Sequence, residues 1–339
     1  MYQSVSIIIP TGGRPTKLAK CLAALSRQEL PADVSLEVIV ALDGGDAVEF
    51  DIPRDSPPHS RFLRLPRLGV AAARNAAIDV ARGDLLIFSN DDTYPRRDWV
   101  REHLVGQDRR AAPGMLLGET RWITWPNPTV FDGLLRDTSM IFFYNKMKGG
   151  QSYGFRHFWT CNASVPMSMV RAIGGFNARI RPVFFEDCEF AFRIEQKFGD
   201  RVYFHPGAVN VHDHRITWDD YSNRERLLGR MAVRLAHANA DCFEAIYGSA
   251  QVQTLAGEFG RWLEMDKGDH ERTENALRAW FDRPLDEIKN WQALRELMYV
   301  THLPLKRRLF RDAFIEETQR DLAGESPKES QASAITTAL

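Results

Sequence analysis

Short apolar runs alternate with helix-like repeats along the first 90 residues. Runs of strand length, rich in β-branched or other apolar side chains, occupy residues 5–10, 36–42, 62–65 and 85–88. Between them, apolar residues recur at helical spacing over 18–25, with Thr16 as the expected N-cap, and the segment 69–81 is alanine-rich. The order strand, helix, strand, strand, helix, strand predicts an α/β fold whose central sheet is mostly parallel and flanked by helices.

The pattern is less regular between residues 90 and 217. We expect helices at 99–107, at 167–173 and from 186 onward, and strands at 115–125, 158–166, 201–204 and 208–211. Residues 127–151 fit neither period, and their adjacent glycines and mixed aromatics favour a mobile loop over a site.

Helical patterns replace the strands from Trp218 onward, and the last residues are rich in Ser, Thr, Ala and Glu. The sequence therefore predicts a sheet domain over 1–217, a C-terminal helical extension over 218–323 and a disordered tail over 324–339. Within the extension, residues 303–314 form a basic amphipathic stretch. It favours a helix docked on the sheet domain or on a second subunit over a helix on a membrane surface, and a homo-oligomer stays open.

The composition narrows the class of protein. A hydrophobic content of 44% and a charged content of 26% are typical of a soluble globular protein, and the net charge of −1 argues against a nucleic-acid partner. The four cysteines form no CxxC pair, which favours a reducing compartment. No leader-like segment opens the chain and no stretch nears about 20 apolar residues. We therefore expect a cytoplasmic protein, with the inner face of the membrane as an alternative.

Polar residues follow two of the predicted strands at the edge where open α/β sheets bind ligands. Asn90, Asp91 and Asp92 follow the strand at 85–88, and two carboxylates there suit a hard divalent ion that carries a diphosphate. A simple Asx turn explains the same residues. Asp43 ends the strand at 36–42 and can accept from a nucleobase N–H, although an isolated aspartate there is more often a turn residue.

Five further residues, in three segments, are candidates for binding or catalysis. Arg74 can bind a phosphate through its guanidinium, or be a surface arginine. Glu186 and Asp187 stand at the start of a predicted helix, where acidic side chains interact favourably with the helix dipole. Alternatively, one of them serves as a general base, whose pKa the adjacent phenylalanines raise by excluding water. His212 and His214 lie on one side of an extended segment, as metal ligands or as a surface pair.

No GxGxxG or GxxxxGK[ST] motif opens either early helix, which disfavours a dinucleotide dehydrogenase and a P-loop enzyme. Taken in order, seven segments resemble family 2 glycosyltransferases with the GT-A fold: residues 5–14, Asp43-Gly44, 69–75, Asn90-Asp91-Asp92, Gly174-Gly175-Phe176, Glu186-Asp187 and the strand ending at His212. The resemblance spans about residues 4–215. It implies an inverting, nucleotide-sugar-dependent enzyme with 1–217 as its catalytic domain.

The resemblance also implies roles for individual residues. Asp187 matches the catalytic base, and Asp92 with His212 matches the site of a divalent ion, Mn²⁺ or Mg²⁺, with His214 as the less favoured substitute. The acceptor, a carbohydrate or glycoconjugate, would meet Trp159, unless that side chain belongs to the core, and Glu186. The residues implied to contact the nucleoside-diphosphate sugar are Pro10, Thr11, Arg14, Asp43, Arg74, Asn90 and Asp91.

One departure from the family pattern keeps alternatives open. Asn90 stands at the first acidic position of the DxD metal motif, and its neutral amide neutralises less of the metal charge. The amide at this position makes a non-catalytic subunit that binds a sugar nucleotide a plausible alternative to an enzyme. A sugar nucleotidyltransferase ranks lower, because residues 11–14 make a poor glycine-rich basic loop. Our expectation is a metal-dependent transferase that builds a polysaccharide or glycoconjugate.

Overall fold

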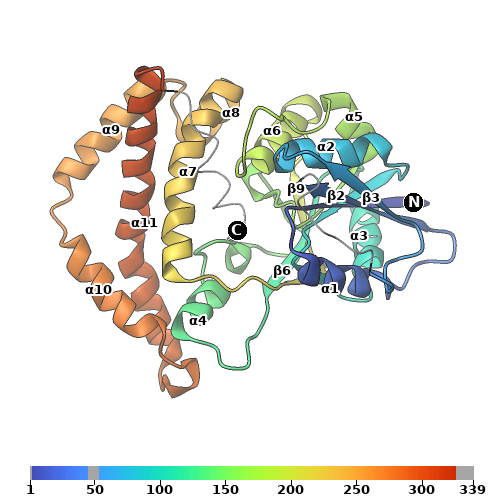
Figure 1. Cartoon of the computed structure of the whole chain (residues 1–339), viewed down its shortest axis with the longest axis horizontal. Helices are drawn as coiled ribbons and strands as arrows, with labels where there is room; N and C mark the ends of the chain where they lie inside the picture. Colours follow the sequence, from blue (N-terminus) through green and yellow to red (C-terminus); the bar gives the residue numbers. More distant parts are fainter. Residues whose placement is uncertain (1, 45–52, 326–339) are drawn as a thin grey trace. The chain divides into compact units, whose positions relative to one another are not determined.

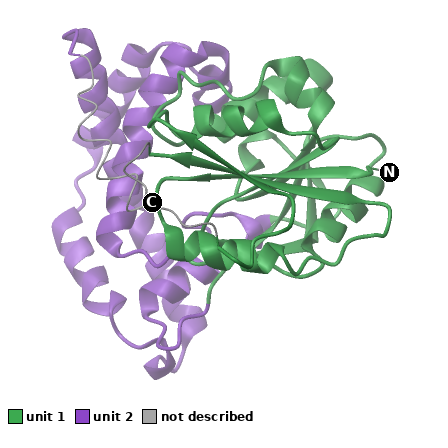
Figure 2. Cartoon of the chain, turned by 45° about the vertical axis from the view of Figure 1, so that its right-hand side comes forward, with its two compact units in different colours: residues 1–123, 147–213 green, residues 124–146, 214–339 purple. Residues whose placement is uncertain are grey.

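The computed structural model describes residues 2–44 and 53–325, and its contacts divide the chain into two compact units (Figures 1 and 2). Unit 1 is drawn from residues 1–123 and 147–213, and unit 2 from residues 124–146 and 214–339. Of the predicted disordered tail, 324–339, residues 326–339 lie outside the described residues. The predicted boundary at residue 217 stays a prediction about domain organisation.

Unit 1 is built on a nine-stranded sheet in the order β3-β2-β1-β4-β8-β6-β9-β5, with β7 paired to β9. Its strands are β1 (Ser4–Thr11), β2 (Ser35–Asp43), β3 (Ser60–Leu65), β4 (Leu85–Ser89), β5 (Thr93–Pro95), β6 (Leu116–Trp122), β7 (Ser152–Tyr153), β8 (Asn162–Pro166) and β9 (Val202–His212). Its helices are α1 (Pro15–Leu25), α2 (Val70–Val80), α3 (Trp99–Asp108), α5 (Met167–Ile173) and α6 (Glu186–Phe198).

The predicted parallel core is confirmed for β1 to β4, which pair in parallel with β1 and β2 at the centre. The sheet as a whole is mixed, because β8 runs antiparallel to both β4 and β6, and β5 runs antiparallel to β9. Apolar runs mark where strands lie but carry no information on their direction. Figure 1 shows α1 and α3 on one side of the strands and α2, α5 and α6 on the other, as the α/β prediction requires.

The core explains why these segments become strands. Alternate residues of β1, β2 and β4, such as Ile7, Val38 and Ile87, share one cluster with the buried residues of α1. The residues between them, including Ile8 and Phe88, are also fully buried. A strand that buries side chains on both faces reads as a continuous apolar run, which is why β1, β2 and β4 were predictable.

Some local predictions were wrong. Thr16 is not the N-cap of α1, since the helix begins at Pro15, whose fixed φ suits the first helical position, and Arg14 takes the cap. The two short strands expected at 201–204 and 208–211 are one strand, β9. Of the strand expected at 158–166, only β8 is extended.

Unit 2 is helical. Its helices are α4 (Val130–Asp137), α7 (Trp218–Ala238), α8 (Ala240–Tyr247), α9 (Val252–Met265), α10 (His270–Phe281) and α11 (Trp291–Leu322). The prediction of a mobile loop over 127–151 is wrong where α4 forms. A reciprocal capping box between Thr129 and Asp132 stabilises the N-terminus of this helix. Trp291 of α11 donates its indole N–H to Asp137 at 2.7 Å, so this segment is packed within unit 2.

The basic stretch at 303–314 is part of α11. Leu305 and Phe314 are buried, and Phe314 packs against Phe243 of α8 and Phe259 of α9. Figure 1 shows α7, α9 and α11 running alongside one another, in line with the packing of α11 on both. The apolar side of this stretch is thus covered by helices of its own unit. Among the described residues, no helix combines the length and apolar character needed to cross a membrane.

A pair of helical glycines gives a stability prediction for unit 2. A Cβ at Gly229 of α7 would overlap the carbonyl oxygen of Phe310 on α11, whereas Gly260 of α9 has open space around it. We expect Gly229→Ala to lower the free energy of unfolding by about 2 kcal/mol, because overpacking forces α7 and α11 apart. Gly260→Ala should raise it by about 0.5–1 kcal/mol through helix propensity. Urea denaturation followed by circular dichroism measures both, and equal effects of the two variants would contradict the close packing of α7 on α11.

Candidate functional site

An aspartate and a histidine from distant parts of the chain meet beside β5. Asp92 follows β4, and His212 is the last residue of β9, where it pairs with Thr93. Oδ1 of Asp92 lies 3.3 Å from Nε2 of His212, and Asp92 is fully buried. Asp92, His212 and His214 each offer a ligand atom, and the three atoms lie within 4.8 Å of one another. A carboxylate with imidazoles fits a divalent ion, so the predicted metal ligands are brought together and His214 joins them.

Arg14 bridges the two carboxylates of the acidic motif. Its Nη2 lies 2.5 Å from Oδ1 of Asp91, and its Nη1 lies 2.7 Å from Oδ2 of Asp92. The Thr11 hydroxyl donates to Asp91 at 2.6 Å. Burial raises the pKa of Asp91, and the positive charge of Arg14 opposes that shift. Three predicted donor-binding residues therefore form one network that holds Asp92 in position.

Asp213 also forms hydrogen bonds that hold Asp92 and its neighbours in place, and the sequence analysis missed this residue. Its backbone N–H donates to the carbonyl of Asp92 at 2.8 Å, and its carboxylate accepts from the Tyr94 hydroxyl at 2.5 Å. Lys17 donates to its carbonyl at 2.6 Å. The only signal in the sequence was its place between two histidines, since residues flanking metal ligands often orient them.

Asp187 is the second residue of α6, a helix that begins directly after two residues in a strained conformation. Phe184 and Phe185 have φ angles of 71° and 66°, in the left-handed region that bulky residues avoid. The backbone N–H of Cys188 donates to the Asp187 carboxylate at 2.7 Å. Burial raises the pKa of Asp187 to about 7, with the Glu186 charge adding to the shift and Arg74 opposing it. A carboxyl group with this pKa can accept a proton near neutral pH.

The surroundings of Cys161 show that the carboxylates of Asp187 and Asp92 lie near the same side chain. Burial, and to a smaller extent the charges of Asp187 and Asp92, raise the pKa of its thiol to about 12, and the hydrogen bond between the thiol and the Thr120 hydroxyl opposes this shift. Both aspartates are therefore within electrostatic range of one side chain just before β8. The structure thus places the predicted base and the predicted metal ligand around the same part of unit 1.

Arg74 and Glu186 form a buried ion pair with a 2.8 Å separation. The guanidinium also lies 5.4 Å from the ring centroid of Phe176. The pair ties α2 to the start of α6 and so supports the position of Asp187. No sequence signal links residues 112 positions apart, and the predicted contacts of Arg74 with phosphate and of Glu186 with the acceptor stay predictions.

The other predicted residues lie as follows. Asp43, at the end of β2, accepts from the backbone N–H groups of Leu68 at 2.5 Å and Gly69 at 2.9 Å, which is the turn role weighed for it. Pro10 is buried in β1, and the carbonyl of Asn90 accepts from the Thr93 hydroxyl at 2.9 Å. Trp159 is half-buried, with its ring centroid 5.9 Å from that of His157. Because β2 and β4 flank β1 in parallel, Asp43 and Asp92 share one edge of the sheet.

Comparisons with known proteins bear on the family and the fold of this chain. Residues 6–171 match the model of the family described as glycosyl transferase family 2. The pre-mycofactocin glycosyltransferase of Mycobacterium tuberculosis is 25% identical over 287 residues, which are 79% of this chain and 53% of that protein. The uncharacterized glycosyltransferase YfnE of Bacillus subtilis is 34% identical over 107 residues, covering 30% of this chain and 26% of that protein. The chain thus spans about half the length, or less, of these curated relatives.

Two solved structures share the fold. The mannosyltransferase PcManGT from Pyrobaculum calidifontis, in complex with GDP-Man and Mn²⁺, has a TM-score of 0.54 at 16% identity, covering 96% of this chain and 88% of that one. Residues 1–349 of S. aureus TarS give a TM-score of 0.50 at 13% identity, covering 96% and 93%. Together with the mixed sheet and its flanking helices, these matches show that the chain is a glycosyltransferase with the GT-A fold, whose residues 6–171 match family 2.

Proposed function

We propose that this chain transfers a sugar from a nucleoside-diphosphate donor to a hydroxyl of a carbohydrate or glycoconjugate, with inversion and with a divalent ion. The observation that carries this proposal is the meeting of Asp92, His212 and His214, whose ligand atoms lie within 4.8 Å of one another. The solved PcManGT complex, which holds GDP-Man and Mn²⁺ in a similar fold, supports the same kind of donor and ion. A role in polysaccharide or glycoconjugate synthesis in the cytoplasm belongs to this proposal.

The metal ligands would be Asp92 and His212, with His214 as the third. A bound Mn²⁺ or Mg²⁺ would supply positive charge to the departing diphosphate. Arg14 holds the Asp92 carboxylate through its 2.7 Å contact, so this ligand is positioned before any ion binds. Asn90 adds no charge to the site, and the single anionic ligand Asp92 then carries most of the charge neutralisation.

Asp187 would act as the general base. Its carboxylate takes the proton from the acceptor hydroxyl as the hydroxyl oxygen forms a bond to the anomeric carbon, and the bond from that carbon to the diphosphate oxygen breaks in the same displacement. The proton ends on Asp187, and the diphosphate leaves with the electron pair. Its pKa of about 7 keeps a large fraction of the base ionised near neutral pH.

The remaining residues would bind the two substrates. Asp43 would contact the nucleobase, and Trp159 would stack on the acceptor sugar. A sugar nucleotidyltransferase is less well supported, because Arg14, the cation of its first loop, is committed to Asp91 and Asp92. A non-catalytic binding subunit would share the metal ligands but would not need the raised pKa of Asp187.

A thermal-shift screen with UDP-, GDP- and dTDP-sugars, each with Mn²⁺, Mg²⁺ or EDTA, tests the proposal. We expect one donor class to raise Tm by about 5 °C or more at about a hundred times its Kd, and only with metal, because a ligand of the native state stabilises it. Slow release of nucleoside diphosphate from that donor should follow in the presence of the same metal. Binding without any turnover, with a panel of sugar acceptors, would favour the non-catalytic subunit, and no shift with any donor would overturn the proposal.

A further inference from the structure

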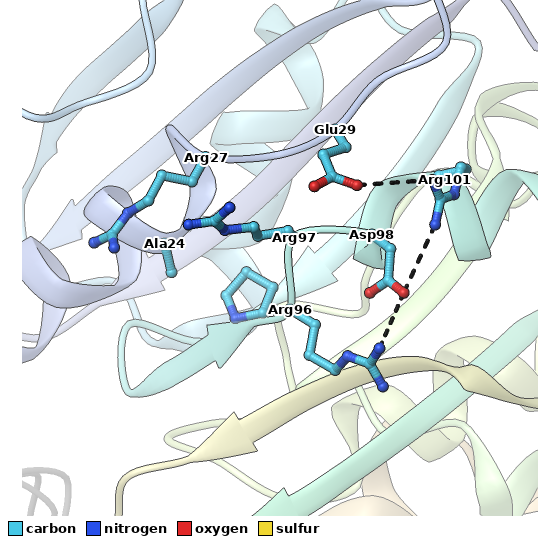
Figure 3. A pocket seen from close by; sticks show the side chains of 8 residues that line it. Ala24, Arg27, Glu29, Arg96, Arg97, Asp98 and Arg101 are labelled. Atoms are coloured by element: carbon cyan, nitrogen blue, oxygen red, sulfur yellow. Dashed lines mark hydrogen bonds and ion pairs between the residues drawn. The ribbon is translucent and has the colours of Figure 1, made fainter.

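Unit 1 has a second charged site that shares no residue with the candidate catalytic site. A cavity of about 570 Å³ lies where the end of α1 meets the loop between β5 and α3 (Figure 3). Four arginines line it: Arg27, Arg96, Arg97 and Arg101. They come from three segments, namely the end of α1, the loop after β5 and the first turn of α3.

The cavity has an excess of positive charge. Its four arginines face two acids, Glu29 and Asp98, which leaves a net charge of +2 in a chain whose net charge is −1. Asp98 lies 3.1 Å from Arg96 and 3.8 Å from Arg101, and Glu29 lies 3.7 Å from Arg101. Within the described part of the chain, neither Arg27 nor Arg97 forms an ion pair, so the guanidinium group of Arg97 and the terminal nitrogens of Arg27, whose Nε donates to a backbone carbonyl, are available to an anion.

Hydrogen bonds hold the two walls of the cavity together. Gln28 donates its side-chain amide to the carbonyl of Arg96 at 2.7 Å, and its side-chain oxygen accepts from the N–H of Val100 at 3.0 Å. The N–H of Glu29 donates to the carbonyl of Arg97 at 2.8 Å. Arg27 donates to the carbonyl of Ala23 at 2.8 Å, which directs its side chain. The backbone that carries the arginines is thus fixed in advance, which reduces the entropy lost when a ligand binds.

We propose that this cavity binds a phosphoryl group, as a phosphomonoester or a diphosphate. The planar fork of arginine matches phosphate oxygens in pairs, and several arginines around one cavity suit a group that carries two or more negative charges. None of the eight described residues that line the cavity is aromatic, so nothing there stacks on a nucleobase or a sugar. The recognised chemistry is therefore the phosphate itself, in a soluble compound or in an anionic lipid headgroup.

Calorimetric titration of the full chain with inorganic pyrophosphate, in EDTA and at low salt, tests the proposal. The double variant Arg27→Gln/Arg97→Gln should bind pyrophosphate at least about tenfold more weakly than the wild type, because each charge-assisted hydrogen bond contributes to affinity. The matched control is Arg82→Gln/Arg109→Gln, two exposed arginines of unit 1 outside the cavity, which should bind as the wild type does. Equal affinity of the wild type and the Arg27/Arg97 variant, or equal loss in both double variants, would overturn the site.

A second arm identifies the source of the phosphate. Vesicles of phosphatidylcholine with phosphatidic acid, compared with phosphatidylcholine alone, should retain the wild type but not the Arg27/Arg97 variant if the ligand is a lipid headgroup. Pyrophosphate binding without retention on the vesicles would assign the site to a soluble phosphate. Neither arm depends on the proposed transfer reaction, since the Arg27/Arg97 variant leaves the metal ligands and Asp187 unchanged.

Discussion

We expect Asp187→Asn to abolish glycosyl transfer while the protein still binds its donor. The amide keeps the size of the side chain but cannot accept the proton of the acceptor hydroxyl, and general bases contribute about 10²–10⁴-fold to rate. Initial rates with donor and acceptor, beside donor affinity by calorimetry, separate the two effects. Asp108→Asn, an exposed carboxylate at the end of α3, is the matched control and should be fully active. Wild-type turnover in Asp187→Asn would remove this residue as the base.

The pH dependence follows from the raised pKa. With Asp187 as the proposed base, transfer needs the ionised carboxylate, so kcat/KM of the wild type should fall about tenfold per pH unit below about 7 and level off above it. Donor affinity measured over the same range should not follow this curve. A rate that stays flat between pH 5 and pH 8 would contradict a base with this pKa.

The same pKa predicts an effect on stability with a defined sign. Folding raises the pKa of Asp187 from 3.8 to about 7, so the folded state holds the proton more tightly than the unfolded state. The wild type therefore loses stability as pH rises from about 4 to about 7. Asp187→Asn removes the buried charge, so its Tm should exceed that of the wild type at pH 8 and match it near pH 4. A variant that is less stable at pH 8 would show that the carboxylate is structurally required.

The sequence predicts those parts of unit 1 where local chemistry and burial act together. β1, β2 and β4 are buried on both faces, so an unbroken apolar run marks each of them. The polar residues that follow β4 were identified because such residues do not stay buried without partners. The histidine that ends β9 was identified because an imidazole at a strand end beside carboxylates suits a metal ligand. The pairing of Asp92 with His212 then follows from the sheet, since β5 returns directly beside β9.

The remainder depends on contacts that no local pattern encodes. The ion pair between Arg74 and Glu186 joins α2 to α6 across 112 positions, and each residue alone fits a surface role. The helix α4 has only eight residues and carries Gly133, which lowers helix propensity. A Cβ at Gly133 would crowd the Trp291 side chain, so tertiary packing rather than propensity explains that glycine. The directions of β8 and β9 could not be predicted from the sequence either, because parallel and antiparallel strands use the same apolar residues.

The two adjacent aspartates of the acidic motif should respond differently to the same substitution. Asp92→Asn should lower the affinity for Mn²⁺ about a hundredfold or more, because the carboxylate beside His212 is the anionic ligand of the proposed site. Asp91→Asn should leave that affinity within about threefold but lower the free energy of unfolding by about 3 kcal/mol, because it weakens the buried pair with Arg14. The electron paramagnetic resonance signal of free Mn²⁺ reports binding without any substrate, and urea denaturation reports stability.

This comparison separates a metal ligand from a structural acid within two consecutive residues. Both carboxylates are buried and both contact Arg14, so a loss of fold alone would affect the two variants alike. His212→Ala extends the test, since it removes an imidazole without disturbing the Arg14 network, and it should weaken Mn²⁺ binding as Asp92→Asn does. If Asp92→Asn binds Mn²⁺ as tightly as the wild type, the ion is not held by this carboxylate, and charge on the departing diphosphate would have to be met by arginine side chains instead.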